Sequence, residues 1–361
     1  MAVIILSFGK ASADSSYTYR NQTRQEIANG DQTSIGSPFR LATYPGQALT
    51  AGPCRPRLVV LGRKRNQTTM RGLPRIQAEE ADLTTFDFDG QTQDGLKLQG
   101  RGWQPDSQPR AAVVLIHGVG EHTGRYAHVG EALSGAGFAL LGYDLRGHGR
   151  SQGRRGHTPS YDHLLDDISL TFQVARSRYP QARIFLYGHS LGATLALLYA
   201  IQRSPGVEGV VATGPVFRTA FAPPPLKIAA GRLLDRLVPT FTMYNEVNPA
   251  HLSHDPAVVR AYVEDPLVHN RISARMGIGL IDLGSRLLAR YGELKVPVLL
   301  MCGRDDRLTS TAASREFASM AGPICTLKEW EGLYHEIHNE PQKAQVIAFM
   351  LDWMRSRLPP A

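Results

Sequence analysis

The chain has 361 residues, of which 42% are hydrophobic and 20% are charged, a balance typical of a globular protein with a sizeable core. Its three cysteines, Cys54, Cys302 and Cys325, are too few and too scattered for a disulfide framework or a zinc site, so we expect a reducing compartment and a cytoplasmic protein. No apolar run approaches the roughly 18 residues of a membrane span.

Residues 1–80 carry most of the positive charge. The formal net charge is +8, and this segment has eleven Lys and Arg against five Asp and Glu, a net of +6 that leaves +2 for residues 81–361. It shows no sustained period of 2 or 3.6, so we predict a disordered basic segment. "AVIILSF" lacks the basic region of a signal peptide, and we favour a solvated tail over a nucleic-acid patch. Met70 is an alternative start that would leave the preceding residues outside the protein.

Residues 81–361 are predicted to form one folded domain. Residues 83–103 alternate, turn at Asp-Gly pairs and alternate again, which is typical of a β-hairpin. Strands are then predicted at 111–118, 138–147, 183–188, 207–214, 296–303 and 324–332, and helices at 126–137, at 159–180, from 191 and at 342–358. Because strands alternate with helices, we predict an α/β fold with a mostly parallel sheet covered on both faces.

The alternation stops between residues 216 and 294. This stretch has no strong strand pattern, and we predict a helical lid inserted over the C-terminal edge of the sheet. Five apolar residues recur in it at helical spacing between charged ones: Leu226, Ala230, Leu233, Leu234 and Leu237. We favour the interpretation that this stripe covers the active site of the same molecule. The alternative is an amphipathic face that contacts a membrane.

Ser190 lies in the sequence Gly188-His189-Ser190-Leu191-Gly192, between a predicted strand and a predicted helix. This context fits the G-x-S-x-G nucleophile elbow, in which the serine occupies a strained turn and its oxygen projects over the sheet. Glycine is needed on both sides because a Cβ there would collide with the neighbouring strand or helix. We predict that Ser190 is a nucleophile, and the alternative is a structural turn serine.

A serine nucleophile needs a histidine base that a carboxylate orients, and in this fold the chain order is Ser, Asp or Glu, then His. The strand at 296–303 leads to Asp305 and Asp306, and the loop after the next strand holds His335 and His338. Spacing alone leaves the choice within each pair open. A mechanism of this kind requires no metal and no cofactor.

The oxyanion of such a reaction needs two N–H donors. His117 and Gly118 follow a core strand directly, so we predict the backbone N–H groups of Val119 and Leu191 as the donors. We interpret His117, His148 and His189 as structural residues.

Five segments, taken together, identify a resemblance. "HGVGEHTGRY", "DLRGHGRSQG", "GHSLGA", "CGRDDRL" and "EGLYHEIHNE" resemble, in order and spacing, the monoacylglycerol lipases of the α/β-hydrolase superfamily. The resemblance runs from about Leu96 to Leu358, lid included, and residues 1–80 have no counterpart. It implies the α/β-hydrolase fold, with Asp306 as the acid and His335 as the base.

The resemblance also implies a pocket for the glycerol end of the substrate, formed by Glu121, Arg125 and His338. The alternative is that Glu121 and Arg125 only pair with each other and brace their loop. One departure is visible, because Thr309 stands where the vertebrate enzymes carry a cysteine. We expect this to alter sensitivity to thiol reagents and not the reaction.

We therefore expect a serine esterase that hydrolyses monoacylglycerols to glycerol and free fatty acid through an acyl-enzyme. The alternatives are a lysophospholipase or a general carboxylesterase of the same fold. A prolyl aminopeptidase would need an acidic cluster, which the candidates do not form in sequence: Glu246, Asp255, Glu264 and Asp265. A non-catalytic interaction protein of this fold would usually lack a triad residue. The expected partner is a small lipid ester and not a nucleic acid, and the oligomeric state and acyl length stay open.

Overall fold

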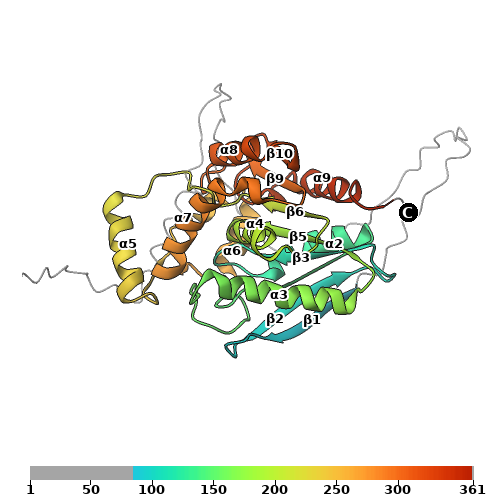
Figure 1. The fold of residues 1–361 in the computed structure, drawn as a ribbon, viewed down its shortest axis with the longest axis horizontal. Coiled ribbons are helices and arrows are strands. Elements are labelled where there is room, and N and C mark those ends of the chain that lie inside the picture. Colours follow the sequence, from blue (N-terminus) through green and yellow to red (C-terminus); the bar gives the residue numbers. More distant parts are fainter. Residues whose placement is uncertain (1–83, 360–361) are drawn as a thin grey trace, which may run out of the picture. The chain divides into compact units, whose positions relative to one another are not determined.

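An eight-stranded sheet forms the centre of the computed structural model, which describes residues 84–359 (Figure 1). The prediction for residues 1–80 lies outside the described residues. The strand order is β1-β2-β4-β3-β5-β6-β9-β10. The bounds are β1 Thr84–Gln91, β2 Lys97–Gln104, β3 Ala111–Ile116, β4 Phe138–Tyr143, β5 Arg183–His189, β6 Gly209–Thr213, β9 Val298–Gly303 and β10 Cys325–Trp330.

The first two strands form the predicted antiparallel hairpin, with Thr84 opposite Gln104. Strand β2 also runs antiparallel to β4, and the remaining pairs of the sheet are parallel. Every residue of β3, β4, β6 and β9 is buried. Such strands read as continuous apolar runs because both of their faces are covered.

Helices cover both faces of the sheet (Figure 1). Side chains of α3, α4 and α8 pack in the apolar core of one face, and those of α2 and α9 pack in the core of the other. The bounds are α2 Ala127–Gly135, α3 Tyr161–Arg178, α4 Leu191–Arg203, α8 Thr311–Ala321 and α9 Lys343–Arg355. The predicted α/β class with a mostly parallel, doubly covered sheet is confirmed.

Local capping explains where the long helix α3 begins. The Ser160 side chain accepts a hydrogen bond from the backbone N–H of His163 at 3.4 Å, so the helix starts one residue later, at Tyr161. Asp162 lies in its first turn and Arg176 and Arg178 lie in its last, which suits the helix dipole.

The chain leaves the sheet between β6 and β9 and forms what we call the insertion, residues 216–294. Its elements are α5 Pro225–Leu237, β7 Thr242–Tyr244, α6 Pro256–Glu264, β8 Arg271–Ser273 and α7 Ala274–Ala289. Helices α5 and α7 lie side by side (Figure 1). Contrary to the expectation of a purely helical segment, β7 and β8 pair antiparallel. Three residues are too few for the sequence to show a period of 2.

Most of the apolar stripe of α5 faces outward, and Leu234 is its half-buried member. Leu226, Leu233 and Leu237 are 82%, 58% and 70% exposed, and Gly231 is the buried residue of the helix. The favoured interpretation, that the stripe covers the active site, is therefore wrong, because Ile228 and Gly231 face inward instead. Within residues 84–359, no helix is both long and apolar enough to cross a bilayer.

Candidate active site

Ser190 occupies the sharp turn between β5 and α4. Its backbone angles are φ 55° and ψ −117°, a region that non-glycine residues rarely adopt and that stores strain. A Cβ on Gly188 would lie 2.2 Å from the carbonyl oxygen of Gly192, and one on Gly192 would lie 1.9 Å from that of Ile116. Both glycines are therefore required by the close approach of helix, turn and neighbouring strand.

The structure brings Asp306 and His335 together. The Nδ1 atom of His335 lies 2.7 Å from Oδ2 of Asp306. The same carboxylate accepts the backbone N–H groups of Leu308 and Thr309 at 2.8 and 3.0 Å, and the Thr309 hydroxyl at 2.7 Å. Asp305 is exposed. Of the two carboxylates that spacing left open, Asp306 is thus the one that orients an imidazole, and Thr309 helps to hold it.

The electrostatics of the pair favour its ionised form. Burial alone would raise the pKa of Asp306, but the imidazole of His335 and the Thr309 hydrogen bonds hold it below its usual value. Burial would likewise lower the pKa of His335, and the Asp306 carboxylate outweighs it, so that this pKa lies above its usual value. The imidazole is therefore a stronger base than a free histidine, which suits a group that must take a proton from a serine.

Backbone amides lie next to Ser190. A Cβ built on Gly118 would lie 3.4 Å from the Cβ of Ser190, so the loop with Gly118 and Val119 approaches the serine closely. Leu191 is the first residue of α4, and an N–H group at this position has no acceptor inside the helix. These are the two places where oxyanion donors are expected.

Glu121, Arg125 and Glu336 form a buried ionic network, which we call the Arg125 network. The Arg125 guanidinium donates to Glu121 at 2.7 Å and to both oxygens of Glu336 at 2.6 and 2.7 Å. Glu121 also accepts the backbone N–H of Gly118 at 2.6 Å and the Tyr126 hydroxyl at 2.8 Å. The network therefore joins the loop beside Ser190 to the loop of the histidine, since Glu336 directly follows His335.

Of the three residues predicted to form the glycerol pocket, Glu121 lines the cavity at Ser190, and Arg125 and His338 do not. Arg125 is turned toward its two carboxylates. His338 is buried and stacks on Tyr126, with ring centroids 4.9 Å apart. Glu121 and Arg125 pair with each other, as in the alternative stated for them, but Arg125 also binds Glu336 of a second loop, so the brace is not confined to one loop.

The three histidines interpreted as structural have internal partners. His117 accepts the backbone N–H of Leu145 at 2.8 Å, and His148 and His189 contact the Arg146 carbonyl and the Thr213 hydroxyl. Burial and the neighbouring His335 lower the pKa of His189 to about 4. His189 is therefore neutral at pH 7 and adds no positive charge next to the base.

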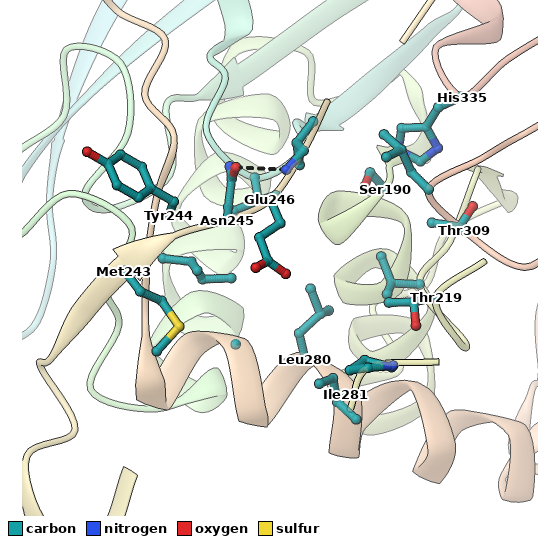
Figure 2. Close-up of a pocket in the computed structure, with 18 of the residues that line it drawn as sticks. Ser190, Thr219, Met243, Tyr244, Asn245, Glu246, Leu280, Ile281, Thr309 and His335 are labelled. Atoms are coloured by element: carbon teal, nitrogen blue, oxygen red, sulfur yellow. Dashed lines mark hydrogen bonds between the residues drawn. The ribbon is translucent and has the colours of Figure 1, made fainter. Parts of the chain in front are cut away.

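A cavity of about 230 Å³ runs from the serine into the insertion. Figure 2 shows Ser190 and His335 on one side and Met243 on the opposite side, with Leu280 of α7 on the wall. Apolar side chains and glycines make up most of the wall inside the insertion. A long apolar group attached to a carbonyl at Ser190 would fit against this apolar wall.

Sequence reasoning missed two polar groups near this cavity. Asn245 lines the cavity and its side-chain oxygen accepts the Val247 N–H at 3.1 Å (Figure 2). Its Nδ2 atom is buried and has no hydrogen-bond partner among the residues that the structure describes. Glu336 was not singled out, although an acid directly after a candidate base is a signal. Asn245 offered none, because its position depends on the short β7–β8 pairing.

The sheet topology and the strained serine define the class, a serine hydrolase of the α/β-hydrolase superfamily. A family model described as "Serine aminopeptidase, S33" matches residues 107–342, and the chain belongs to this family.

Individual similar proteins refine the class of serine hydrolase to which the chain belongs. The monoacylglycerol lipase of Mycolicibacterium smegmatis is 34% identical over 73% of this chain and 95% of its own. Phospholipase YtpA of Bacillus subtilis is 30% identical over 68% of this chain and 94% of its own. An uncharacterized abhydrolase domain-containing protein of Dictyostelium discoideum is 37% identical over 74% of this chain, which spans only 28% of that protein. The crystal structure of Paleococcus ferrophilus monoacylglycerol lipase matches with a TM-score of 0.64 at 33% identity, over 76% of this chain and 99% of that one. The chain is thus a monoacylglycerol lipase-like serine hydrolase.

Proposed function

We propose that the protein hydrolyses monoacylglycerols to glycerol and free fatty acid. His335 takes the proton of Ser190 while the serine oxygen attacks the ester carbonyl, and Asp306 fixes the tautomer of His335. The backbone N–H groups of Val119 and Leu191 stabilise the oxyanion. His335 then protonates the departing glycerol, and water hydrolyses the acyl-enzyme. The observation that carries this proposal is the His335–Asp306 pair beside a strained serine at the end of an apolar cavity.

The polar groups near Ser190 support a glycerol-like leaving group. Glu121 and Asn245 both line the cavity, and the Nδ2 atom of Asn245 is buried without a hydrogen-bond partner within residues 84–359. A buried N–H donor without a partner is costly, and a substrate hydroxyl would supply the missing acceptor. We therefore assign the glycerol end to Glu121 and Asn245, with Arg125 acting through Glu121. The insertion is the lid, and its apolar wall holds the acyl chain.

The charges of the cavity favour an ester over a peptide with a free amino terminus. Glu121, Glu246 and Glu336 line it. Each already has partners in the protein, because Arg125 pairs with Glu121 and Glu336, and Lys227 pairs with Glu246. A substrate ammonium would therefore have to share one of these carboxylates with the cation that already binds it.

We also propose that α5 contacts the lipid surface that supplies the substrate, on the cytoplasmic side. Leu226, Leu233 and Leu237 are exposed on one helix. Lys227, Arg232 and Arg236 lie between them, the first two paired with Glu246 and Asp282. Apolar side chains flanked by basic ones suit an anionic bilayer. The double variant Leu233→Glu/Leu237→Glu should lose co-sedimentation with anionic vesicles and keep its activity on a soluble ester.

The deciding experiment compares 1-monoacylglycerols, lysophosphatidylcholine and p-nitrophenyl esters as substrates for the wild type, Ser190→Ala and Asn245→Leu. We expect glycerol release that requires Ser190, and for Asn245→Leu a raised KM on monoacylglycerols with p-nitrophenyl ester hydrolysis unchanged. A clear preference for lysophosphatidylcholine would support the phospholipase alternative. The similarity to Phospholipase YtpA favours this alternative. If Ser190→Ala retained full ester hydrolysis, the mechanism itself would be refuted.

A further inference from the structure

Helix α7 contains three glycines, Gly277, Gly279 and Gly284, within Ala274–Ala289. Glycine inside a helix is unfavourable relative to alanine, because it loses more backbone freedom on folding. Each of these positions therefore calls for a physical reason.

Two of the three glycines have a packing reason. A Cβ on Gly279 would lie 2.3 Å from the ring of Tyr161, and a Cβ on Gly284 would lie 2.2 Å from the carbonyl oxygen of Val216. Neither position has room for alanine, since one neighbour is the partly buried ring of Tyr161 and the other is backbone.

Gly277 has no such reason. The nearest atoms to a Cβ there belong to the Ile272 side chain, at 3.7 and 3.8 Å, which is ordinary contact distance. Its backbone also needs no special conformation, as it lies within the regular helix. What distinguishes Gly277 is that it lines the cavity that contains Ser190.

Its neighbours place Gly277 far from the serine. Ile272, the residue nearest to its missing side chain, is paired with Met243 across the β7–β8 ladder. Met243 lies on the opposite side of the cavity from Ser190 and His335 (Figure 2). A side chain at position 277 would thus project into the end of the cavity that the distal part of an acyl chain reaches.

We propose that Gly277 sets the length of the acyl chain that the enzyme accepts, by leaving the far end of the cavity open. This inference rests on the proposed function in that the cavity holds an acyl chain, and it does not depend on glycerol as the leaving group. Larger residues at position 277 shorten the usable cavity and leave the chemistry at Ser190 intact.

The test uses p-nitrophenyl esters from butyrate to palmitate with the wild type, Gly277→Ala, Gly277→Val and Gly277→Phe. The matched control is Ser285→Phe, which places the same bulk on an exposed position of the same helix. We expect butyrate hydrolysis within about twofold of the wild type. For palmitate, kcat/KM should fall by about tenfold or more in Gly277→Val, since one methylene group too many in a pocket costs about that factor. The control should leave the profile unchanged.

An equal loss on all esters, or an unchanged ratio of long to short, would overturn the assignment. Should Gly277→Phe not fold, the graded series of Ala and Val still decides, because the Cβ that both introduce meets only ordinary contacts with Ile272. A wild type that cleaves the esters but not monoacylglycerols would refute the proposed function and leave the Gly277 test intact. Cleavage of monoacylglycerols with an unchanged chain-length profile in Gly277→Val would refute the Gly277 assignment alone.

Discussion

Replacing Arg125 by methionine tests the network that joins the loop beside Ser190 to the loop of His335. The Arg125 side chain is 9% exposed, and those of Glu121 and Glu336 are 3% exposed. Methionine keeps much of the volume but removes the cation, so two buried carboxylates lose their counter-charge. Removal of one partner of a buried pair costs about 3–5 kcal/mol of unfolding free energy, and we expect Arg125→Met to lose that amount at pH 7.

The loss should depend on pH with a definite sign. Burial opposes ionisation of Glu336, but Arg125 overcomes it and holds the pKa of Glu336 below its usual value of about 4.3. In the wild type this contribution to stability is present above pH 4.3 and is lost as the pH falls through the lowered pKa. In Arg125→Met, burial acts without the cation and raises the pKa, so stability is lost as the pH rises. The difference between the two proteins should be largest at neutral pH and shrink toward pH 5.

Urea unfolding at pH 7 and pH 5 measures both quantities. The double variant Arg125→Met/Glu336→Gln is the control, because it removes one of the two unpaired charges and should recover part of the loss. A destabilisation below about 1 kcal/mol, or one that grows at low pH, would refute the reasoning. A raised KM for monoacylglycerols alone, with normal stability, would instead support Arg125 as a direct glycerol ligand.

Three further predictions concern the serine and its base. Asp306 raises the pKa of His335, and catalysis needs the neutral imidazole, so kcat/KM should fall on the acid side with an apparent pKa above 6.5. Asp306→Asn should move this apparent pKa to a lower value and reduce kcat by about 10⁴. Profiles of kcat and kcat/KM against pH measure both effects. Ser190→Gly should relieve the strained backbone and raise the unfolding free energy by about 1–3 kcal/mol while abolishing activity, and an unchanged urea midpoint would contradict this. Gly192→Ala, with its Cβ 1.9 Å from the Ile116 carbonyl oxygen, should yield no cooperatively melting protein.

The sheet and the elbow were predictable from the sequence because their signals are local. Buried parallel strands are continuous apolar runs. The five residues around Ser190, with a glycine at each end, themselves indicate a strained turn that approaches its neighbours closely. The predicted strand at 207–214 and the hairpin at 83–103 correspond to β6 and to β1 with β2. Residue type and chain order are sufficient where each element is determined by its own residues.

The insertion resisted the same reasoning because its contacts are not local. Strand β7 forms only by pairing with β8, 27 residues further along the chain at the closest pair, Tyr244 and Arg271. The α5 stripe has the period of a buried face and is nevertheless exposed, since the helix meets α7 through Gly231 and Ile278. A helical period identifies the apolar face of a helix, but it does not identify the element against which that face packs.

The same limit applies to the predicted glycerol pocket, of which Glu121 lines the cavity and Arg125 and His338 do not. The resemblance identified matching residue types at positions 121, 125 and 338. The role of an arginine, however, depends on which side chains it contacts in the folded protein. Here Glu336, the residue after His335, accepts two of the Arg125 hydrogen bonds, and Arg125 does not line the cavity. A bidentate arginine has a fixed fork geometry, and the three hydrogen bonds of Arg125 all go to Glu121 and Glu336, while Arg125 is absent from the cavity lining. The residue that follows His335 in sequence therefore makes Arg125 a brace between the loop of His335 and the loop beside Ser190.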